Sequence, residues 1–298
     1  MRNNKLIGTG VALVTPFNED YTIDFPSLKR LIENLLENNI DYFVVMGTTA
    51  ESATLSLQEQ DQVIYFVNQI VKNKIPIVIG VGGNNTMDVI ARIKNLDLSN
   101  VEAILCVSPY YNKPSQEGLV FHYEKIAEVS PVDIIMYNVP SRTAVNIEVN
   151  TVEYLSNKYS NIIAIKEASG NIAQCMDLIT KCPDDFMIIS GDDKMTLPII
   201  LLGGVGVISV QAMVFPLTFS DMVTSALNDN FNNASKQHYK LLKSVDLLYV
   251  DGNPSGIKEA LSFLKICNSN QVRLPLVKMK KENAEALHNC LNTFSNKR

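Results

Sequence analysis

Residues 162–170 read IIAIKEASG, a short apolar run that ends abruptly in charge and glycine. Such a run, bounded by turn residues, is typical of a parallel strand that is covered on both faces. Lys166 would then stand at the end of the strand, where its side chain enters a pocket. Partial burial lowers the pKa of an amine and frees it to attack a carbonyl, which indicates an aldolase-like enzyme. The plainer interpretation is a lysine in an ion pair at a strand end.

Seven similar runs lie elsewhere in the chain, at 10–17 (GVALVTPF), 42–47 (YFVVMG), 75–82 (IPIVIGVG), 103–110 (AILCVSPY), 133–140 (DIIMYNVP), 186–193 (FMIISGDD) and 205–210 (VGVISV). Helical patterns separate them, beginning near Asp24, Ser56, Thr86, Ser115, Asn150 and Asn171. Ser56 and Glu59 form a capping box. Strict alternation through eight units predicts an α/β fold of the (β/α)8 or TIM-barrel type. A doubly wound sheet is the alternative, but no glycine-rich dinucleotide turn follows the first run.

Strand signals stop beyond Phe215, and residues 219–294 have the patterns of several helices, including 257–266 and 282–294. No flexible linker or low-complexity tract precedes this region. We therefore expect a barrel over residues 1–218 and a C-terminal helical extension, packed on the barrel, over residues 219–298.

Composition excludes several classes of partner. The net charge of the 298 residues is -5, so no basic field exists to attract nucleic acid or anionic lipid. The uncharged segment 195–220 is long enough to cross a bilayer, but prolines and glycines interrupt it, and it divides into a buried helix and a strand. The five cysteines are odd in number and lack CxxC spacing, which favours reduced thiols and a cytoplasmic location.

In a barrel of this kind the chemistry lies where strands end and the following loops begin. Hydroxyls, phenols, one arginine and one lysine follow the predicted strands, whereas His122, His238 and His288 all fall in helical stretches. A metal site is therefore not expected. Asp192 and Asp193 could hold a divalent ion, but a solvated or helix-capping pair is the better interpretation. The glycines of residues 203–206 precede the eighth strand, at the opposite mouth, which disfavours a phosphorylated substrate.

If Lys166 forms a Schiff base, the neighbouring residue types acquire roles. Imine formation needs proton transfer to a carbinolamine hydroxyl, for which Tyr137, Tyr111 and Thr48 are candidates. The Thr48-Thr49 turn offers donors for the carboxylate of an α-keto acid. Arg142 would suit a second carboxylate. The plainer interpretations are packed tyrosines with hydrated hydroxyls and a surface ion pair of the arginine.

Six segments, in this order and spacing, resemble the dihydrodipicolinate synthase family. They are GTTAES (47–52), SPYYN (108–112), YNVPSRT (137–143), IKEASG (165–170), GDD (191–193) and GVISV (206–210). The family belongs to the pyruvate-dependent class I aldolases, which include N-acetylneuraminate lyase, and the resemblance covers essentially the whole chain.

The resemblance implies a role for each matching residue. Lys166 would form the imine with pyruvate, Thr48 and Thr49 would bind the pyruvate carboxylate, and Arg142 would receive the carboxylate of aspartate semialdehyde. Protons would pass through Thr48, Tyr111 and Tyr137, with Tyr111 reaching in from a neighbouring subunit. Gly191 and Ile208 would line the keto-acid pocket through their backbones.

The resemblance also implies a reaction and an assembly. Pyruvate and L-aspartate 4-semialdehyde would condense to 4-hydroxy-tetrahydrodipicolinate, for lysine biosynthesis through diaminopimelate, in a homo-oligomer that is a tetramer (a dimer of dimers) or a dimer. No cofactor would be needed beyond the imine on Lys166. N-acetylneuraminate lyase or a 2-keto-3-deoxy sugar acid aldolase is the alternative activity, but Arg142 favours the synthase. A non-catalytic, ligand-sensing barrel is the alternative from another class.

Two features leave questions open. Ala50 and Ala144 stand where the family usually has glycine, and each would cost about 1 kcal/mol if its φ must be positive. Some relatives are inhibited by lysine, and the residues that fit such a site are Ser52, Ala53, Asn84, Asp88 and Tyr110. Asp88 shortens an expected glutamate, and Leu57 and Gln60 replace histidines of lysine-sensitive relatives, so inhibition stays open.

Overall fold

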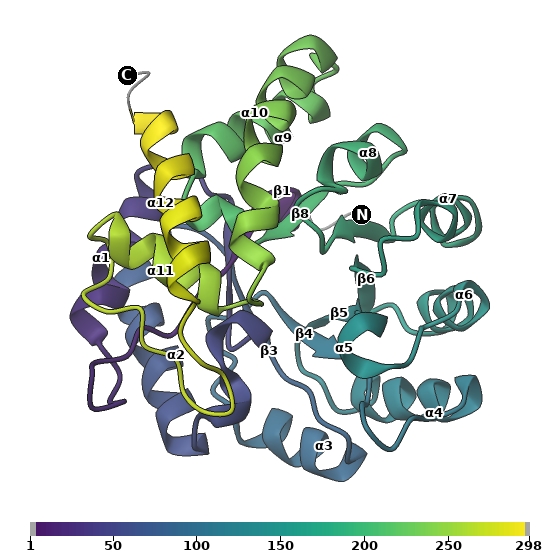
Figure 1. Cartoon of the computed structure of the whole chain (residues 1–298). Coiled ribbons are helices and arrows are strands. Elements are labelled where there is room, and N and C mark those ends of the chain that lie inside the picture. The colour runs from purple at the N-terminus through teal and green to yellow at the C-terminus, as the bar shows by residue number, and fades with distance from the viewer. Residues whose placement is uncertain (1–3, 296–298) are drawn as a thin grey trace.

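Eight parallel strands form a closed barrel, in which each strand pairs with its neighbours in sequence and β1 pairs with β8 (Figure 1). The computed structural model describes residues 4–295. The strands are β1 Gly8–Ala12, β2 Tyr42–Val45, β3 Ile77–Gly80, β4 Ala103–Val107, β5 Asp133–Asn138, β6 Ile162–Glu167, β7 Met187–Ser190 and β8 Gly206–Ser209. The predicted (β/α)8 fold is thereby confirmed. Most of the predicted runs extend past the strand ends because the following loop residues, such as Leu13 and Val14, are buried as well.

Helices follow the strands in the order that the sequence predicts. They are α1 Phe25–Leu36, α2 Leu57–Val71, α3 Thr86–Asn95, α4 Gln116–Ala127, α5 Pro140–Thr143, α6 Val149–Lys158, α7 Ile172–Lys181, α8 Thr196–Leu201, α9 Pro216–Leu227, α10 Phe231–Tyr249, α11 Ser255–Phe263 and α12 Lys281–Ser295, with 3-10 turns η1 Asn4–Leu6, η2 Thr48–Ala50, η3 Ser52–Thr54 and η4 Gln211–Met213. The Asp24 side chain accepts from the Ser27 amide, and both hydrogen bonds of the predicted Ser56–Glu59 capping box are present. These caps satisfy amides that have no partner inside the helix.

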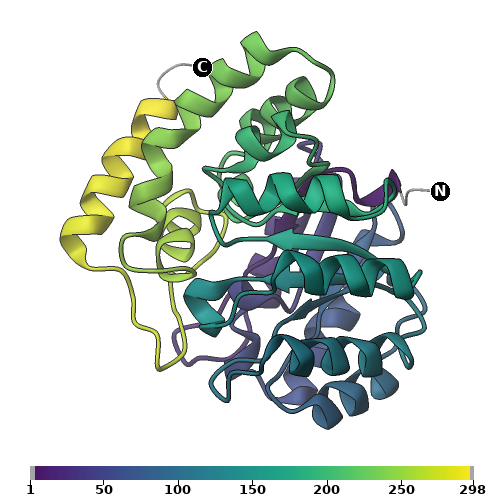
Figure 2. The same ribbon diagram turned by 90° about the vertical axis from the view of Figure 1, so that its right-hand side faces the viewer.

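The C-terminal helices lie outside the ring of barrel helices, with α12 beside α10 along one flank (Figure 2). The division into domains predicted between residues 218 and 219 stays a prediction, and that point lies inside α9. Because α9 packs on β1 and β8, it completes the ring as the eighth barrel helix. No helix within residues 4–295 is long and apolar enough to span a bilayer.

The register between β5 and β6 fixes which side chains face the barrel interior. Ile134 pairs with Ile162 but Ile135 pairs with Ala164, so Ile163 is an additional residue in β6. Such a bulge changes the alignment of every residue beyond it. Tyr137 consequently lies directly opposite Lys166, and the next pair is Asn138 with Glu167.

Barrel closure depends on a close approach between β8 and β1. Gly206 has a φ of +149°, and a Cβ at this position would lie 2.0 Å from the backbone oxygen of Gly8. We predict that Gly206→Ala lowers the free energy of unfolding by at least about 3 kcal/mol, because backbone must move to admit the methyl group. Urea denaturation measures this change.

Gly170→Ala is the matched control for backbone strain. Gly170 has a φ of +74°, but nothing lies within 4 Å of an added Cβ. We expect it to cost only about 1 to 2 kcal/mol, the strain of the left-handed conformation. Equal losses in the two variants would show that the contact between β1 and β8 does not limit closure.

Candidate active site

A cavity of about 350 Å³ opens at the carboxyl ends of the strands. Lys166 from β6, Tyr137 from β5 and the Thr48-Thr49 turn after β2 contribute to its wall. Arg142 of α5 and Gly191 after β7 complete the predicted residues that line it. Six of the predicted site residues, separated by up to 143 positions, therefore meet at one cavity.

Lys166 is only 6% exposed, and its Nζ lies 4.3 Å from the centroid of the Tyr137 ring. Within residues 4–295 its amine forms no ion pair with a carboxylate, unlike the lysines that pair across the surface. The plainer interpretation of a structural ion pair therefore does not hold. A buried amine beside a phenol, in a cavity, is placed to react with a carbonyl.

Glu167, next in sequence, points to the opposite side of the strand because successive side chains alternate. Its buried carboxylate accepts hydrogen bonds from Asn138 Nδ2 at 2.8 Å, Gln174 Nε2 at 2.9 Å and the Ser169 amide at 2.6 Å. These bonds tie β6 to β5 and α7 outside the barrel. The carboxylate beside Lys166 in sequence is thus held away from the amine by its own partners.

The Thr48-Thr49 turn and Arg142 meet at Asn253, a residue of the C-terminal extension. Asn253 Nδ2 donates to Thr49 Oγ1 at 2.9 Å, and Arg142 Nη2 donates to the Asn253 backbone oxygen at 3.4 Å. Thr48 and Arg142 are exposed toward the cavity, and Arg142 forms no ion pair within residues 4–295. The guanidinium therefore stays available for an anionic ligand.

Asp193 is neither solvated nor a helix cap, which contradicts the expectation for the acidic pair at residues 192 and 193. Its carboxylate is buried and accepts hydrogen bonds from Ser209 Oγ at 2.6 Å, the Gln211 amide at 3.0 Å and Tyr249 Oη at 3.0 Å. Burial raises the pKa of Asp193, and these hydrogen bonds oppose that change. Asp193 therefore joins the β7 loop to β8 and α10. Asp192 accepts from the amides of Lys194 and Met195 in the turn before α8, but no side chain caps that helix.

Sequence reasoning did not identify the part of the wall that the extension provides. Val245, Asp246 and Tyr249 of α10 line the cavity together with Asn253. No local pattern in the sequence marks these residues, because a contact such as the hydrogen bond from Tyr249 to Asp193 joins positions far apart in the chain. The extension is therefore part of the site.

Two predicted site residues do not line this cavity. Ile208 lies on β8 with its side chain 1% exposed, and its role stays a prediction. Tyr111 is 91% exposed on the loop after β4 and has a φ of 72°. Within its own chain, Tyr111 therefore does not reach Lys166 or the other residues of the cavity wall.

The residues of the predicted lysine site lie outside the cavity. Ser52 and Ala53 belong to η3, Asp88 to α3, and Asn84 and Tyr110 to the loops after β3 and β4. The Asn112 side chain donates to the Asn84 backbone oxygen at 2.9 Å, which joins these two loops. Lysine binding there stays a prediction.

The two alanines in place of glycine have different consequences. Ala144 has a φ of 58° and ends α5 in the left-handed conformation, at a cost of about 1 kcal/mol. Ala50 lies within η2 and is not among the residues with positive φ. The left-handed residue of that turn is Glu51, with a φ of 56°.

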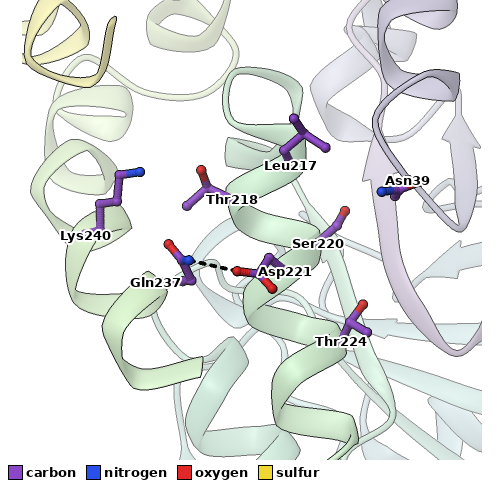
Figure 3. A pocket seen from close by; sticks show the side chains of 8 residues that line it. All are labelled: Asn39, Leu217, Thr218, Ser220, Asp221, Thr224, Gln237 and Lys240. Carbon is purple, nitrogen blue, oxygen red and sulfur yellow. Dashed lines mark hydrogen bonds between the residues drawn. The ribbon is translucent and has the colours of Figure 1, made fainter. Parts of the chain in front are cut away.

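Other cavities lack this combination of groups. A cavity of about 420 Å³ lies between α9 and α10. Among its lining residues, Gln237 points toward Asp221 (Figure 3) and donates to its carboxylate at 2.8 Å. Lys240 is its other charged residue, and no tyrosine lines it. A third cavity lies at the opposite end of the barrel, beside Ile77 at the start of β3. In the described part of the chain, no cluster of three potential metal ligands occurs.

Comparisons with known proteins agree with the resemblance of the motifs. The model of the dihydrodipicolinate synthetase family matches residues 5–294. The 4-hydroxy-tetrahydrodipicolinate synthase of Flavobacterium psychrophilum is 48% identical over 289 residues, which are 97% of each chain. The solved 4-hydroxy-tetrahydrodipicolinate synthase of Methylacidiphilum fumariolicum is 38% identical, with a TM-score of 0.94 over 98% of this chain and 97% of that one. A structure described as the first monomeric dihydrodipicolinate synthase variant is 35% identical, with a TM-score of 0.94 over 97% and 96%.

Gly191 is predicted to matter because it leaves room for the Lys166 side chain. A Cβ at this position would lie 3.0 Å from Lys166 Cε and 2.6 Å from the Ala168 methyl group. Gly191→Ala should therefore displace the amine and slow its capture of pyruvate by roughly tenfold or more. The rate of reductive trapping on Lys166 measures this, with Gly170→Ala as the control. An unchanged rate would mean that the amine has more freedom than its packing indicates.

Proposed function

We propose that this chain, which belongs to the dihydrodipicolinate synthetase family, condenses pyruvate with L-aspartate 4-semialdehyde on the amine of Lys166. The chain is a Schiff-base-forming lyase, and its product, 4-hydroxy-tetrahydrodipicolinate, is an intermediate of lysine biosynthesis through diaminopimelate. The observation that carries the assignment to this cavity is the buried Lys166, unpaired with any carboxylate in residues 4–295 and adjacent to the Tyr137 ring.

Imine formation is the first step. Lys166 Nζ attacks C2 of pyruvate, and the carbonyl oxygen takes up a proton to give the carbinolamine hydroxyl. The nitrogen gives up a proton, and the hydroxyl takes up a proton and leaves as water while the nitrogen electron pair forms the C=N bond. The Tyr137 phenol, beside the amine, is the proposed donor and acceptor of these protons, together with Thr48 and Tyr111.

The pyruvate carboxylate is held by the Thr48-Thr49 turn in this proposal. Asn253 Nδ2 already donates to Thr49 Oγ1, so the proton of the Thr49 hydroxyl can be donated to the substrate. The amides of the turn add further donors toward an anion. Holding the carboxylate here would orient C2 toward the amine, which converts a bimolecular attack into an intramolecular one.

Carbon–carbon bond formation follows. The iminium loses a methyl proton to give an enamine, whose C3 attacks the aldehyde carbon of the semialdehyde while the aldehyde oxygen takes up a proton. Arg142, exposed at the cavity, would bind the carboxylate of this second substrate as a bidentate pair. The amine of the semialdehyde then attacks C2 and expels Lys166 as the ring closes. These steps use only the two substrates, protons and Lys166, so we propose that no external cofactor takes part.

The exposure of Tyr111 supports a homo-oligomer, because an isolated chain holds this ring away from the cavity. We propose a tetramer or a dimer in which Tyr111 reaches the site of a neighbouring subunit. Free thiols at all of its cysteines support a cytoplasmic location, where disulfides rarely persist.

Borohydride trapping tests the assignment of Lys166. Pyruvate and borohydride should add one reduced pyruvate per chain, on the peptide that contains Lys166, and Lys166→Met should abolish the modification. Aspartate semialdehyde added before the borohydride should consume the enamine and so reduce the labelling of Lys166, whereas N-acetylmannosamine, which the sialic acid lyases use, should not. Modification of another lysine, or none, would reject the proposed nucleophile.

Mixed oligomers test the role of Tyr111. Lys166→Met and Tyr111→Phe chains should each be nearly inactive, but mixing them under exchange conditions should restore activity. If Tyr111 acts across an interface, one site in a mixed pair contains Lys166 from one chain and Tyr111 from the other. Absence of restored activity, with mixed oligomers demonstrated by mass, would place the action of Tyr111 within its own chain.

A further inference from the structure

The turn that carries Thr48 and Thr49 depends on Glu51 for its conformation. Glu51 connects η2 to η3 with a φ of 56°, which a residue with a side chain adopts at a cost of about 1 to 2 kcal/mol. Its amide donates to the Thr48 oxygen at 3.1 Å, and its own oxygen accepts from the Thr54 amide at 2.9 Å. A strained residue at the centre of a turn persists only where its surroundings hold it.

The Glu51 side chain is held by Lys258 of α11, more than 200 residues away. Lys258 Nζ donates to Glu51 Oε1 at 2.5 Å and to the Gln271 oxygen at 3.0 Å, and it lies 4.0 Å from the centroid of the Phe17 ring. The Glu51 side chain is 0% exposed and the Lys258 side chain is 2% exposed. Burial lowers the pKa of Lys258 to about 8, and the Glu51 carboxylate opposes that change.

The extension contacts the turn at further points. Glu51 Oε2 accepts from the Arg273 amide at 2.8 Å, and the Arg273 guanidinium donates to the Thr54 oxygen at 2.9 Å and to Glu59. Asn253 donates to the Thr49 hydroxyl from the same region. Residues 253–273 thus contact the turn from the Thr49 hydroxyl to Glu59 in the first turn of α2.

Stability alone does not account for a buried ion pair at this position, because replacing such a pair by two apolar side chains of similar volume often leaves a protein equally stable. What an apolar pair could not do is accept the Arg273 amide and hold the left-handed turn. We propose that Glu51 and Lys258 are positioning residues for the pyruvate half of the reaction: α11, through this pair, fixes the turn that presents Thr48 and Thr49 to the keto-acid carboxylate. This inference rests on the function proposed above.

The test compares three variants. Lys258→Met leaves the Glu51 carboxylate buried without its partner, so it should lower both stability and activity. The double variant Glu51→Met with Lys258→Met replaces the ion pair by an apolar pair, which removes both charges and the acceptor of the Arg273 amide, and it should recover much of the lost stability. Arg30→Ala is the control, because it removes hydrogen bonds from Arg30 to Ile266 and Asn268 in the C-terminal region. Arg30 itself makes no hydrogen bond to the turn in the described residues.

The double variant should keep a selective defect. We expect kcat/KM for pyruvate to fall roughly tenfold or more, with less than about a threefold change in kcat/KM for the semialdehyde. Amide exchange in residues 47–55 should rise in both Lys258 variants and stay at the wild-type level in Arg30→Ala. The inference would be overturned if kcat/KM for pyruvate recovered together with stability in the double variant, or if amide exchange in residues 47–55 did not change.

The two proposals fail in different ways. If wild-type protein does not trap pyruvate on Lys166, the function proposed for the cavity is wrong, whatever the exchange data show. If the wild type traps pyruvate normally and the double variant does so equally fast, the function stands and the positioning role of Glu51 and Lys258 is rejected.

Discussion

The pairing of Tyr137 with Lys166 across β5 and β6 is the constraint on which the site depends. Side chains of a strand alternate between two faces, so a slip of one residue would turn Lys166 out of the barrel. The additional residue Ile163 sets this register, and it also pairs Asn138 with Glu167 on the outer face. One bulge thereby places an amine beside a phenol inside the barrel and holds the neighbouring carboxylate outside it.

The C-terminal extension provides hydrogen-bond partners for polar groups at the open end of the barrel. Tyr249 donates to the buried Asp193, and Asn253 connects Thr49 with Arg142. Glu51 and Lys258 join the carboxylate-binding turn to α11. Buried polar groups need such partners, and here a region that does not belong to the barrel provides them. The extension and the barrel loops are therefore better regarded as one site than as a catalytic domain with an appendage.

The strands and helix starts could be predicted because their signals lie in residues that are close together in the sequence. Continuous apolar runs marked all eight strands, and the caps at Asp24 and Ser56 marked two helix starts, because both signals involve neighbouring residues. Lys166, Tyr137, Thr48, Thr49, Arg142 and Gly191 could be expected at one cavity because each lies at the end of a strand or in the loop that follows it. The role of Asn253, the burial of Asp193 and the pairing of Glu51 with Lys258 could not be predicted, since each depends on a partner brought close only by the closed fold. The expectation of a solvated Asp193 was wrong for that reason.

A crystal structure of the protein grown with pyruvate would show whether Lys166 is the nucleophile of this cavity. We expect continuous density from Lys166 Nζ to C2 of the keto acid, with the Tyr137 hydroxyl near the new bond and the carboxylate against Thr48 and Thr49. Pyruvate bound without a covalent bond in a different cavity, or Lys166 turned toward a carboxylate with the cavity empty, would contradict it.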